Sequence, residues 1–152
     1  MSGIINSAGS RSGVIGTTEI DYEEGTWEAK FTIGGSATGI VHNREYGYYT
    51  KIGRAVHVNG YLSLTSKGSE TGSVLITGLP FTSSSATANS SVASLGLAQT
   101  AFAASTDIGG IHTAGGTTIA LSDTATGAGT TPMDETNLAD NTAIQFQMTY
   151  MT

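Results

Sequence analysis

The chain has 152 residues, no cysteine, and a net charge of −6 at pH 7 from six basic and twelve acidic side chains. The lack of cysteine excludes disulfide bonds and thiolate metal sites, and the negative charge argues against a nucleic acid partner because it repels phosphate. A single domain of this length can bury a core without such cross-links.

Only 12% of the residues are charged, against about 25% in an average soluble domain, and 21 residues are glycine. This composition fits either a disordered low-complexity chain or a β-protein whose small hydroxyl side chains are partly buried against copies of itself. The 38% hydrophobic content and the alternation described below favour the β-protein. No apolar run approaches the ~20 residues of a membrane span and no signal-peptide pattern is present, so we expect no membrane insertion and synthesis in the cytoplasm.

Residues 1–20 are predicted to be an N-terminal attachment segment, and residues 21–152 a β-sandwich domain. The segment is rich in glycine, serine, asparagine and threonine and has few apolar residues, among them Ile4, Ile5, Val14 and Ile15. It is too short and too glycine-rich to fold alone. It could be a free end, or it could become ordered against a partner or a sister chain, and we favour the second interpretation.

The first strands follow directly. Asp21–Trp27 is predicted as a compact acidic turn, and from Trp27 to Ile33 the apolar side chains recur at every second residue, which places them on one face of a sheet. We expect a shorter aromatic strand and turn over residues 46–53 and a clear strand over residues 56–65. In the latter, Gly60 interrupts the apolar face and indicates a bulge or the close approach of another backbone.

The second half is predicted to hold short strands between polar loops. We expect a turn at 67–72, a strand at 74–77, a loop and then a strand of small residues within 82–105, a hairpin of strands 108–112 and 117–121, a long loop at 124–140, and a final strand at 144–150. A helix over 97–104 is an alternative that no capping pattern supports. The last strand has a complete apolar face and should lie centrally. About eight to nine strands predict an all-β fold, an antiparallel two-sheet sandwich of jelly-roll type with an extended N-terminal segment.

The acidic residues do not form a recognisable catalytic pair. Glu23 and Glu24 are adjacent and point to opposite sides of an extended chain, so they do not match the facing acids of a glycosidase. Asp134, Glu135 and Asp140 could offer oxygen ligands to calcium, but their spacing does not fit the calcium-loop motif. Ordinary solvated acids are the simpler interpretation for both groups.

The histidines and serines give no catalytic signal either. His42, His57 and His112 each lack a second ligand at metal-binding spacing, and His57 is expected to be a surface or interface group. No nucleophile elbow and no phosphate-binding glycine loop occurs. We therefore predict no enzyme activity, no cofactor and no bound metal.

The aromatic residues allow two interpretations. Tyr46, Tyr48, Tyr49 and Tyr61 could be platforms on which sugars stack, because a tyrosine offers a large apolar face and a polar hydroxyl. Alternatively, together with Trp27, they fill the core and the contacts between subunits. We favour the second interpretation.

Four segments carry a family resemblance. Tyr22-Glu23-Glu24-Gly25-Thr26-Trp27, Gly47-Tyr48-Tyr49-Thr50-Lys51-Ile52-Gly53-Arg54 and Thr77-Gly78-Leu79-Pro80-Phe81 resemble segments of tailed-bacteriophage virion proteins, and Ser10–Thr18 is similar to the lead-in to such domains. They resemble tail-fibre C-terminal domains of the receptor-binding type and related particle decoration proteins. The resemblance covers roughly residues 10–81. The chain departs from it by Glu28-Ala29, where Thr-Pro is common, and by the absence of a long shaft.

The resemblance implies a homotrimeric β-structure, which would explain the low charge, since faces of small polar side chains can meet around a three-fold axis. We expect a virion structural protein that acts as a trimeric adhesin contacting host surface glycans. The alternative is a capsid cement or decoration protein that clamps neighbouring capsid subunits, and a glycan hydrolase is a third interpretation. The expected partners are the chain itself, other virion proteins bound through the N-terminal segment, and a host glycan. The expected location is the virion surface.

An adhesin of this kind would place its ligand contacts in loops far from the attachment segment. The candidate ligand-contact residues lie in three polar loops: Lys67, Glu70, Asn89, Asp134, Glu135 and Asp140.

Overall fold

The computed structural model describes residues 21–86, 90–99, 108–123 and 130–152. In these residues the regular structure is β-strand apart from one short 3-10 helix, which confirms the all-β prediction. The strands are β1 (Tyr22–Trp27), β2 (Lys30–Ile33), β3 (Val41–Ile52), β4 (Ala55–Ser66), β5 (Val74–Thr77), β6 (Ser91–Gln99), β7 (Ile108–His112), β8 (Thr118–Asp123), β9 (Thr131–Pro132) and β10 (Ala143–Met151). The 3-10 helix η2 spans Glu135–Asn137.

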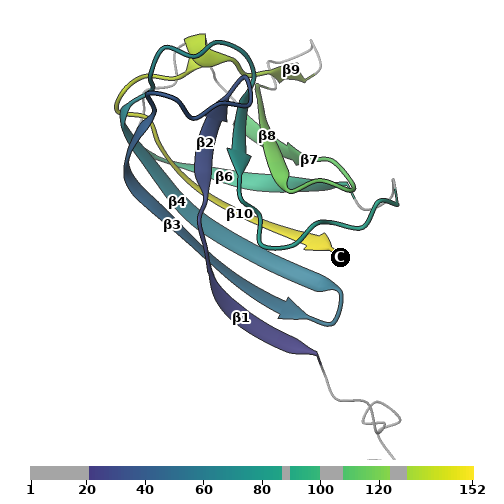
Figure 1. Ribbon diagram of the computed structural model, residues 1–152. Coiled ribbons are helices and arrows are strands. Elements are labelled where there is room, and N and C mark those ends of the chain that lie inside the picture. The colour runs from purple at the N-terminus through teal and green to yellow at the C-terminus, as the bar shows by residue number, and fades with distance from the viewer. Residues whose placement is uncertain (1–20, 87–89, 100–107, 124–129) are drawn as a thin grey trace, which may run out of the picture.

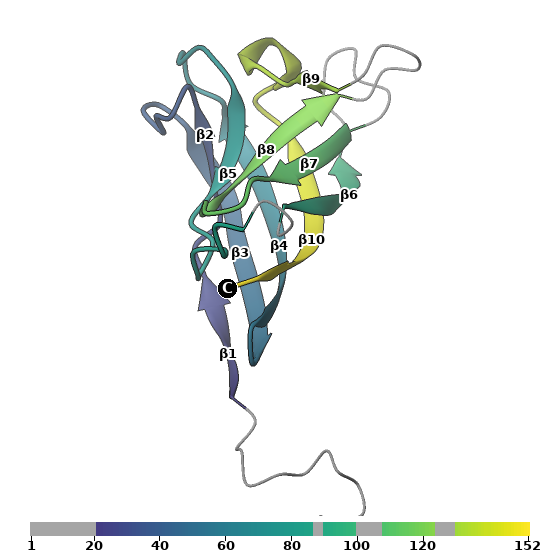
Figure 2. The same cartoon turned by 90° about the vertical axis from the view of Figure 1, so that its right-hand side faces the viewer.

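The strands form one antiparallel sheet in the order β1-β3-β4-β10-β6-β7-β8-β5-β2, with β9 paired to β8. The sheet curls so that two walls face each other (Figures 1 and 2). Strand β6 passes from one wall to the other, because Ser91–Ala93 pair with β7 and the residues from Ser94 onward pair with β10. The antiparallel arrangement is thus confirmed, while the jelly-roll form of the sandwich stays a prediction.

The two ends of the curled sheet are joined along the chain. β1 and β2 stand at opposite ends of the strand order, yet only Glu28 and Ala29 separate them in sequence. Ala29 is fully buried. The chain therefore crosses directly from one wall to the other at this point and holds the walls together.

The core lies between the two walls. In β10 every second side chain is buried, from Ile144 through Phe146 and Met148 to Tyr150. The opposite wall contributes buried side chains from β2, β5 and β8, namely Phe31, Ile33, Ile76, Ile119 and Leu121. β10 lies between β4 and β6, which confirms its predicted central position.

A row of four residues crosses β1, β3, β4 and β10 on the core side: Trp27, Gly47, Gly60 and Phe146. The Trp27 ring lies against Gly47 and the Phe146 ring against Gly60, so that the rings meet edge to face with centroids 5.9 Å apart. A β-carbon at Gly47 would lie 2.7 Å from atoms of the indole ring, and one at Gly60 would collide with the phenyl ring. Both positions therefore require glycine. Of the two alternatives predicted for Gly60, the bulge is wrong, because the pairing of β4 is regular there, and the close approach of another backbone is confirmed, since a β-carbon would lie 2.9 Å from the Tyr46 carbonyl oxygen.

Three other local predictions are corrected. Tyr22–Trp27 is not a turn but strand β1, paired with β3 along its whole length. Most of its side chains are exposed, so it lacks the apolar alternation that marks a strand. β3 begins at Val41, earlier than predicted, because register shifts beside His42 interrupt its pattern.

The third correction concerns the segment predicted as a long loop at 124–140. Its described part contains β9 and η2, and η2 begins with a capping box between Asp134 and Asn137. The helix considered over 97–104 is contradicted where it can be checked, because β6 extends to Gln99. Residues 100–104 lie outside the described part.

His42 bridges β2 and β3, which are not paired in the sheet. The backbone N–H of Phe31 donates to Nε2 of His42 at 3.1 Å, and Nδ1 lies 3.0 Å from a carboxylate oxygen of Glu45. Nε2 must be unprotonated to accept this bond, so the imidazole is neutral when the contact forms. Burial lowers the pKa of His42 and the Lys30 ammonium acts in the same direction, while Glu45 opposes the shift.

Acid should therefore destabilise the fold through His42. Because its pKa is lowered from 6.5 in the folded state, the unfolded chain binds the proton more readily. The free energy of unfolding should fall as the pH drops below about 7, by no more than about 1.4 kcal/mol per pH unit for this one proton. Between about pH 8 and pH 5.5, the free energy of unfolding measured by urea denaturation should depend less on pH in His42→Gln than in the wild type. His57→Gln, which removes an exposed ring beside Thr149, is the control and should keep the wild-type profile. Equal slopes for wild type and His42→Gln would contradict this role.

The glycine row gives a second prediction. Gly60→Ala should lower the free energy of unfolding by about 1–3 kcal/mol, since the new methyl group must displace the Phe146 ring from its contact with Trp27. Gly109→Ala is the matched control, because a β-carbon there meets only Ser122 Oγ at 3.8 Å. In the Gly60→Ala background, Phe146→Leu should lower the free energy of unfolding by less than it does in the wild type, because the colliding ring is already displaced. If the losses of the two substitutions simply add, the collision is disproved.

Candidate functional site

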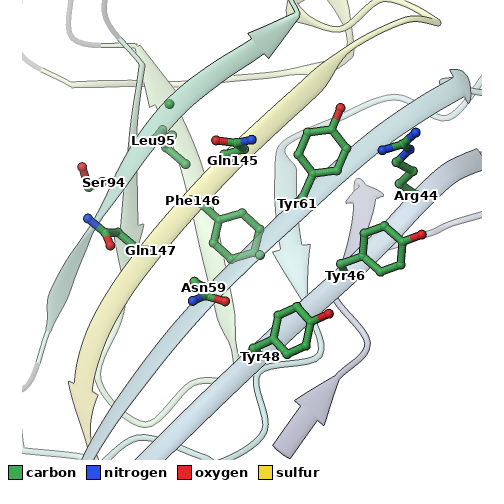
Figure 3. Close-up of a pocket in the computed structure, with 12 residues that line it drawn as sticks. Arg44, Tyr46, Tyr48, Asn59, Tyr61, Ser94, Leu95, Gln145, Phe146 and Gln147 are labelled. Carbon is green, nitrogen blue, oxygen red and sulfur yellow. The ribbon is translucent and has the colours of Figure 1, made fainter.

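The outer face of β3, β4, β10 and β6 carries an open groove of about 840 Å³ (Figure 3). Its polar lining consists of three tyrosines, three amides, one arginine and one serine: Tyr46, Tyr48, Tyr61, Asn59, Gln145, Gln147, Arg44 and Ser94. These side chains come from the strand positions that alternate with the buried core residues. The groove therefore lies over the wall that carries the glycine row, and Gly60 and Phe146 of that row also line it.

Strand pairing places the lining side chains in two cross-strand rows. One row contains Tyr46, Tyr61 and Gln145, and the other Tyr48, Asn59 and Gln147. Neighbouring strands lie about 4.8 Å apart, so each row extends over roughly 10 Å. Each row thus brings at least one aromatic ring and one amide within reach of a single bound group.

Two of the three tyrosines of β3 are unusually exposed for aromatic residues. Tyr46 keeps 53% and Tyr48 56% of its surface accessible. The guanidinium of Arg44 lies 5.9 Å from the centroid of the Tyr61 ring, a cation–π distance. At the other side of the groove Gly96 faces Gln145 and carries no side chain, so the groove stays open toward β6.

This lining suits noncovalent binding of a polar ligand with flat apolar faces. Exposed tyrosine rings can stack on such faces, and the amides offer both hydrogen-bond donors and acceptors. Arg44 is the single charged side chain among the residues that line the groove. Carbohydrates combine apolar ring faces with hydroxyl groups, and they match this set.

The predicted aromatic group is split between two environments. Trp27 is buried in the core, and Tyr49 is half-buried, with its ring edge-on to Phe81 at 5.3 Å. The Tyr49 hydroxyl donates to Glu23 at 2.6 Å, and this hydrogen bond is the main cause that raises the pKa of Tyr49. Tyr46, Tyr48 and Tyr61 instead belong to the groove, as the sugar-platform interpretation requires.

Three of the predicted ligand-contact residues meet at one corner of the molecule. The Lys67 backbone N–H donates to the Asp140 carboxylate at 2.9 Å, and the Lys67 ammonium donates to the Glu135 carbonyl at 2.7 Å. The Glu135 carboxylate accepts from the Gly72 backbone N–H at 2.8 Å. The two loops are thus tied together by their charged side chains.

The remaining candidates are placed differently. Asp134 caps η2, and its hydrogen bonds from the Thr136 hydroxyl and backbone lower its pKa. Glu70 lies in the same β4–β5 loop as Lys67, which Figure 1 shows together with η2 at the end of the molecule away from the start of β1. Asn89 and the attachment residues Ile4, Ile5, Val14 and Ile15 lie outside the described residues.

The three histidines lie apart and have separate hydrogen-bond partners. His57 is exposed with Nδ1 3.1 Å from the Thr149 hydroxyl, and His112 is buried with Nδ1 2.7 Å from the Thr118 carbonyl. Within the described ranges, no group of three or more histidine, aspartate or glutamate side chains is placed to hold a metal ion. No helix in that part of the chain is long and apolar enough to cross a membrane.

Sequence reasoning did not select Arg44, Asn59, Gln145 or Gln147 as site residues. The alternation along 56–65 and 144–150 already assigned Asn59, Gln145 and Gln147 to the polar faces of their strands. The missing information was that these two strands are neighbours, with Asn59 opposite Gln147. The local sequence does not assign Arg44 to either face of its strand, because the register shifts beside it break the alternation.

The chain matches no family model, no curated protein and no solved structure.

Proposed function

We propose that this chain is a bacteriophage virion protein that binds glycans on the host surface and has no enzymatic role. The observation that supports it best is the groove, in which exposed tyrosines and amides line one open face. The assignment to a virion rests on the resemblance of the segments within residues 10–81. The proposed ligand site is the groove on the sheet and not the distal loops, because Lys67, Glu135 and Asp140 already satisfy one another or nearby backbone groups.

The position of the groove agrees with attachment through the N-terminus. The chain enters the described domain at Asp21, where its carbonyl accepts a hydrogen bond from the backbone N–H of Gly53 in the β3–β4 turn. Residues 1–20 precede this end, and we propose that they attach the domain to other virion proteins. On β3 and β4 the groove is lined by residues within 44–48 and 59–61, away from the β3–β4 turn, so an attached domain would still present it to the host.

The binding prediction uses three tyrosines on the sheet. Tyr46→Ala and Tyr48→Ala should each weaken adsorption of the purified protein to immobilised bacterial surface polysaccharides by roughly tenfold, because each removes one stacking ring. Tyr22→Ala is the matched control, since Tyr22 and Tyr48 are equally exposed at 56% but Tyr22 lies on β1 outside the groove. Thermal melting should show that all three variants remain folded.

Two outcomes would contradict the adhesin. One is equal adsorption by the groove variants, which would move the site elsewhere. The other is no adsorption by the wild type, combined with antibody labelling across the head lattice of intact particles. That result would favour the capsid cement alternative.

We also propose a homotrimer, with the jelly-roll arrangement expected for such virion domains. The low charge and the small polar side chains support close subunit contacts. A cross-strand pair of exposed hydrophobic residues, Val92 and Ile111, offers further contact surface.

Light scattering at micromolar concentration should give about three times the chain mass of 15.5 kDa. Val92→Glu should shift the mass toward the monomer if its pair lies in the contact, because a charge is costly to bury. A wild-type protein that stays monomeric on concentration would refute the trimer.

A further inference from the structure

The groove has a charge that differs in sign from the protein as a whole. The chain carries a net charge of −6, yet the lining of the groove contains Arg44 and no carboxylate. Acidic side chains occur close by, at Glu28 and Glu45, which line a smaller hollow of about 400 Å³ together with Tyr46 and Tyr48. The two tyrosines are shared by both hollows, so they separate the acids from the arginine side.

Both neighbouring acids have partners of their own. Glu28 lies 3.1 Å from the Lys30 ammonium, and Glu45 lies 3.0 Å from His42. Among the described residues, the ion pairs within 4 Å do not include Arg44. Glu28 and Glu45 are thus paired with Lys30 and His42, and the Arg44 guanidinium is left available in the groove.

The Tyr61 ring keeps the guanidinium at the groove. Arg44 is exposed and its guanidinium carbon lies 5.9 Å from the Tyr61 centroid. A guanidinium over a ring keeps its N–H groups free at the edge of its plane, and this fork fits the two oxygens of a carboxylate. Figure 3 shows Arg44 beside Tyr46 and Tyr61, with Gln145 on the far side of Tyr61 and Tyr48 further along β3.

We infer that the groove binds an acidic polysaccharide, with Arg44 receiving a sugar carboxylate while Tyr46 and Tyr48 stack on neighbouring sugar rings and the amides bind hydroxyls. This inference rests on the proposed glycan-binding function. The guanidinium fork accepts a carboxylate or a phosphodiester, but the net charge of −6 repels densely charged polymers and so favours a polysaccharide with scattered carboxylates over a polyphosphodiester.

The test compares pairs of polysaccharides that differ only in charge. Carboxylated bacterial capsular polysaccharides are immobilised in native form and after chemical reduction of their carboxylates to alcohols, and a teichoic acid provides the phosphodiester arm. Wild-type protein should bind a native carboxylated polymer about tenfold more tightly than its reduced form, and added salt should diminish the difference.

Arg44→Gln should remove that preference, with about a tenfold loss on the native polymer and little change on the reduced one. Arg44→Lys should restore part of it, because the charge remains and the planar fork is lost. Arg54→Gln is the control, since Arg54 is outside the groove and its Nε donates to the Thr152 carbonyl at 2.8 Å. It should bind like the wild type.

The possible failures are distinguishable. Equal binding of native and reduced polymers, or an unchanged preference in Arg44→Gln, would overturn the carboxylate inference and leave the glycan-binding proposal in place. Stronger binding to teichoic acid that depends on Arg44 would replace the carboxylate by a phosphate. No binding to any polysaccharide would overturn the glycan-binding function itself, and the inference with it.

Discussion

The packing of Trp27 on Phe146 across two glycines is the contact on which the rest of this fold depends. The two rings come from β1 and β10, and they can meet only because Gly47 and Gly60 between them have no side chains. The contact fixes the long β3–β4 hairpin beneath it and orients β1 at the end of the sheet. β1 then leads through buried Ala29 into β2, so the same contact determines where the second wall begins.

The groove follows from this row by alternation. Tyr46 and Tyr48 flank Gly47, Asn59 and Tyr61 flank Gly60, and Gln145 and Gln147 flank Phe146, so all six point to the opposite face from the row. Their mutual positions are set by core packing that they do not take part in. A substitution among them can therefore change binding with little effect on folding, and a substitution in the row should change both. This separation is what makes the face suitable as a recognition surface on a rigid support.

The sequence is informative where a strand has one buried and one exposed face. The alternation predicted β4, β5 and β10 and the β7–β8 hairpin, because each has apolar residues on the core side. It failed for β1, an edge strand with exposed side chains, and for the start of β3, where the register shifts at His42. The groove could be anticipated only in part. The sequence identifies its tyrosines as a group, but Gln145 and Gln147 lie more than 80 residues further along the chain, and pairing over that distance leaves no mark in the local pattern.

Several of the few carboxylates in this chain have a structural role within the fold, independently of the proposed subunit packing. Glu135 and Asp140 accept backbone N–H groups, Glu23 accepts the Tyr49 hydroxyl, and Glu45 is bound to His42, so these acids act as structural hydrogen-bond acceptors. Apart from Arg44, the groove is lined by neutral groups, and each of these contributes only about 0.5–1.5 kcal/mol when it binds a polar ligand. A single groove of this kind would bind a glycan weakly. In the proposed trimer three grooves would engage one polymer surface together, and the second and third contacts would then form at a high effective concentration. The proposed weak contacts and the proposed trimer would complement each other, since reversible binding at each site would let the protein sample a surface while the assembly stayed attached.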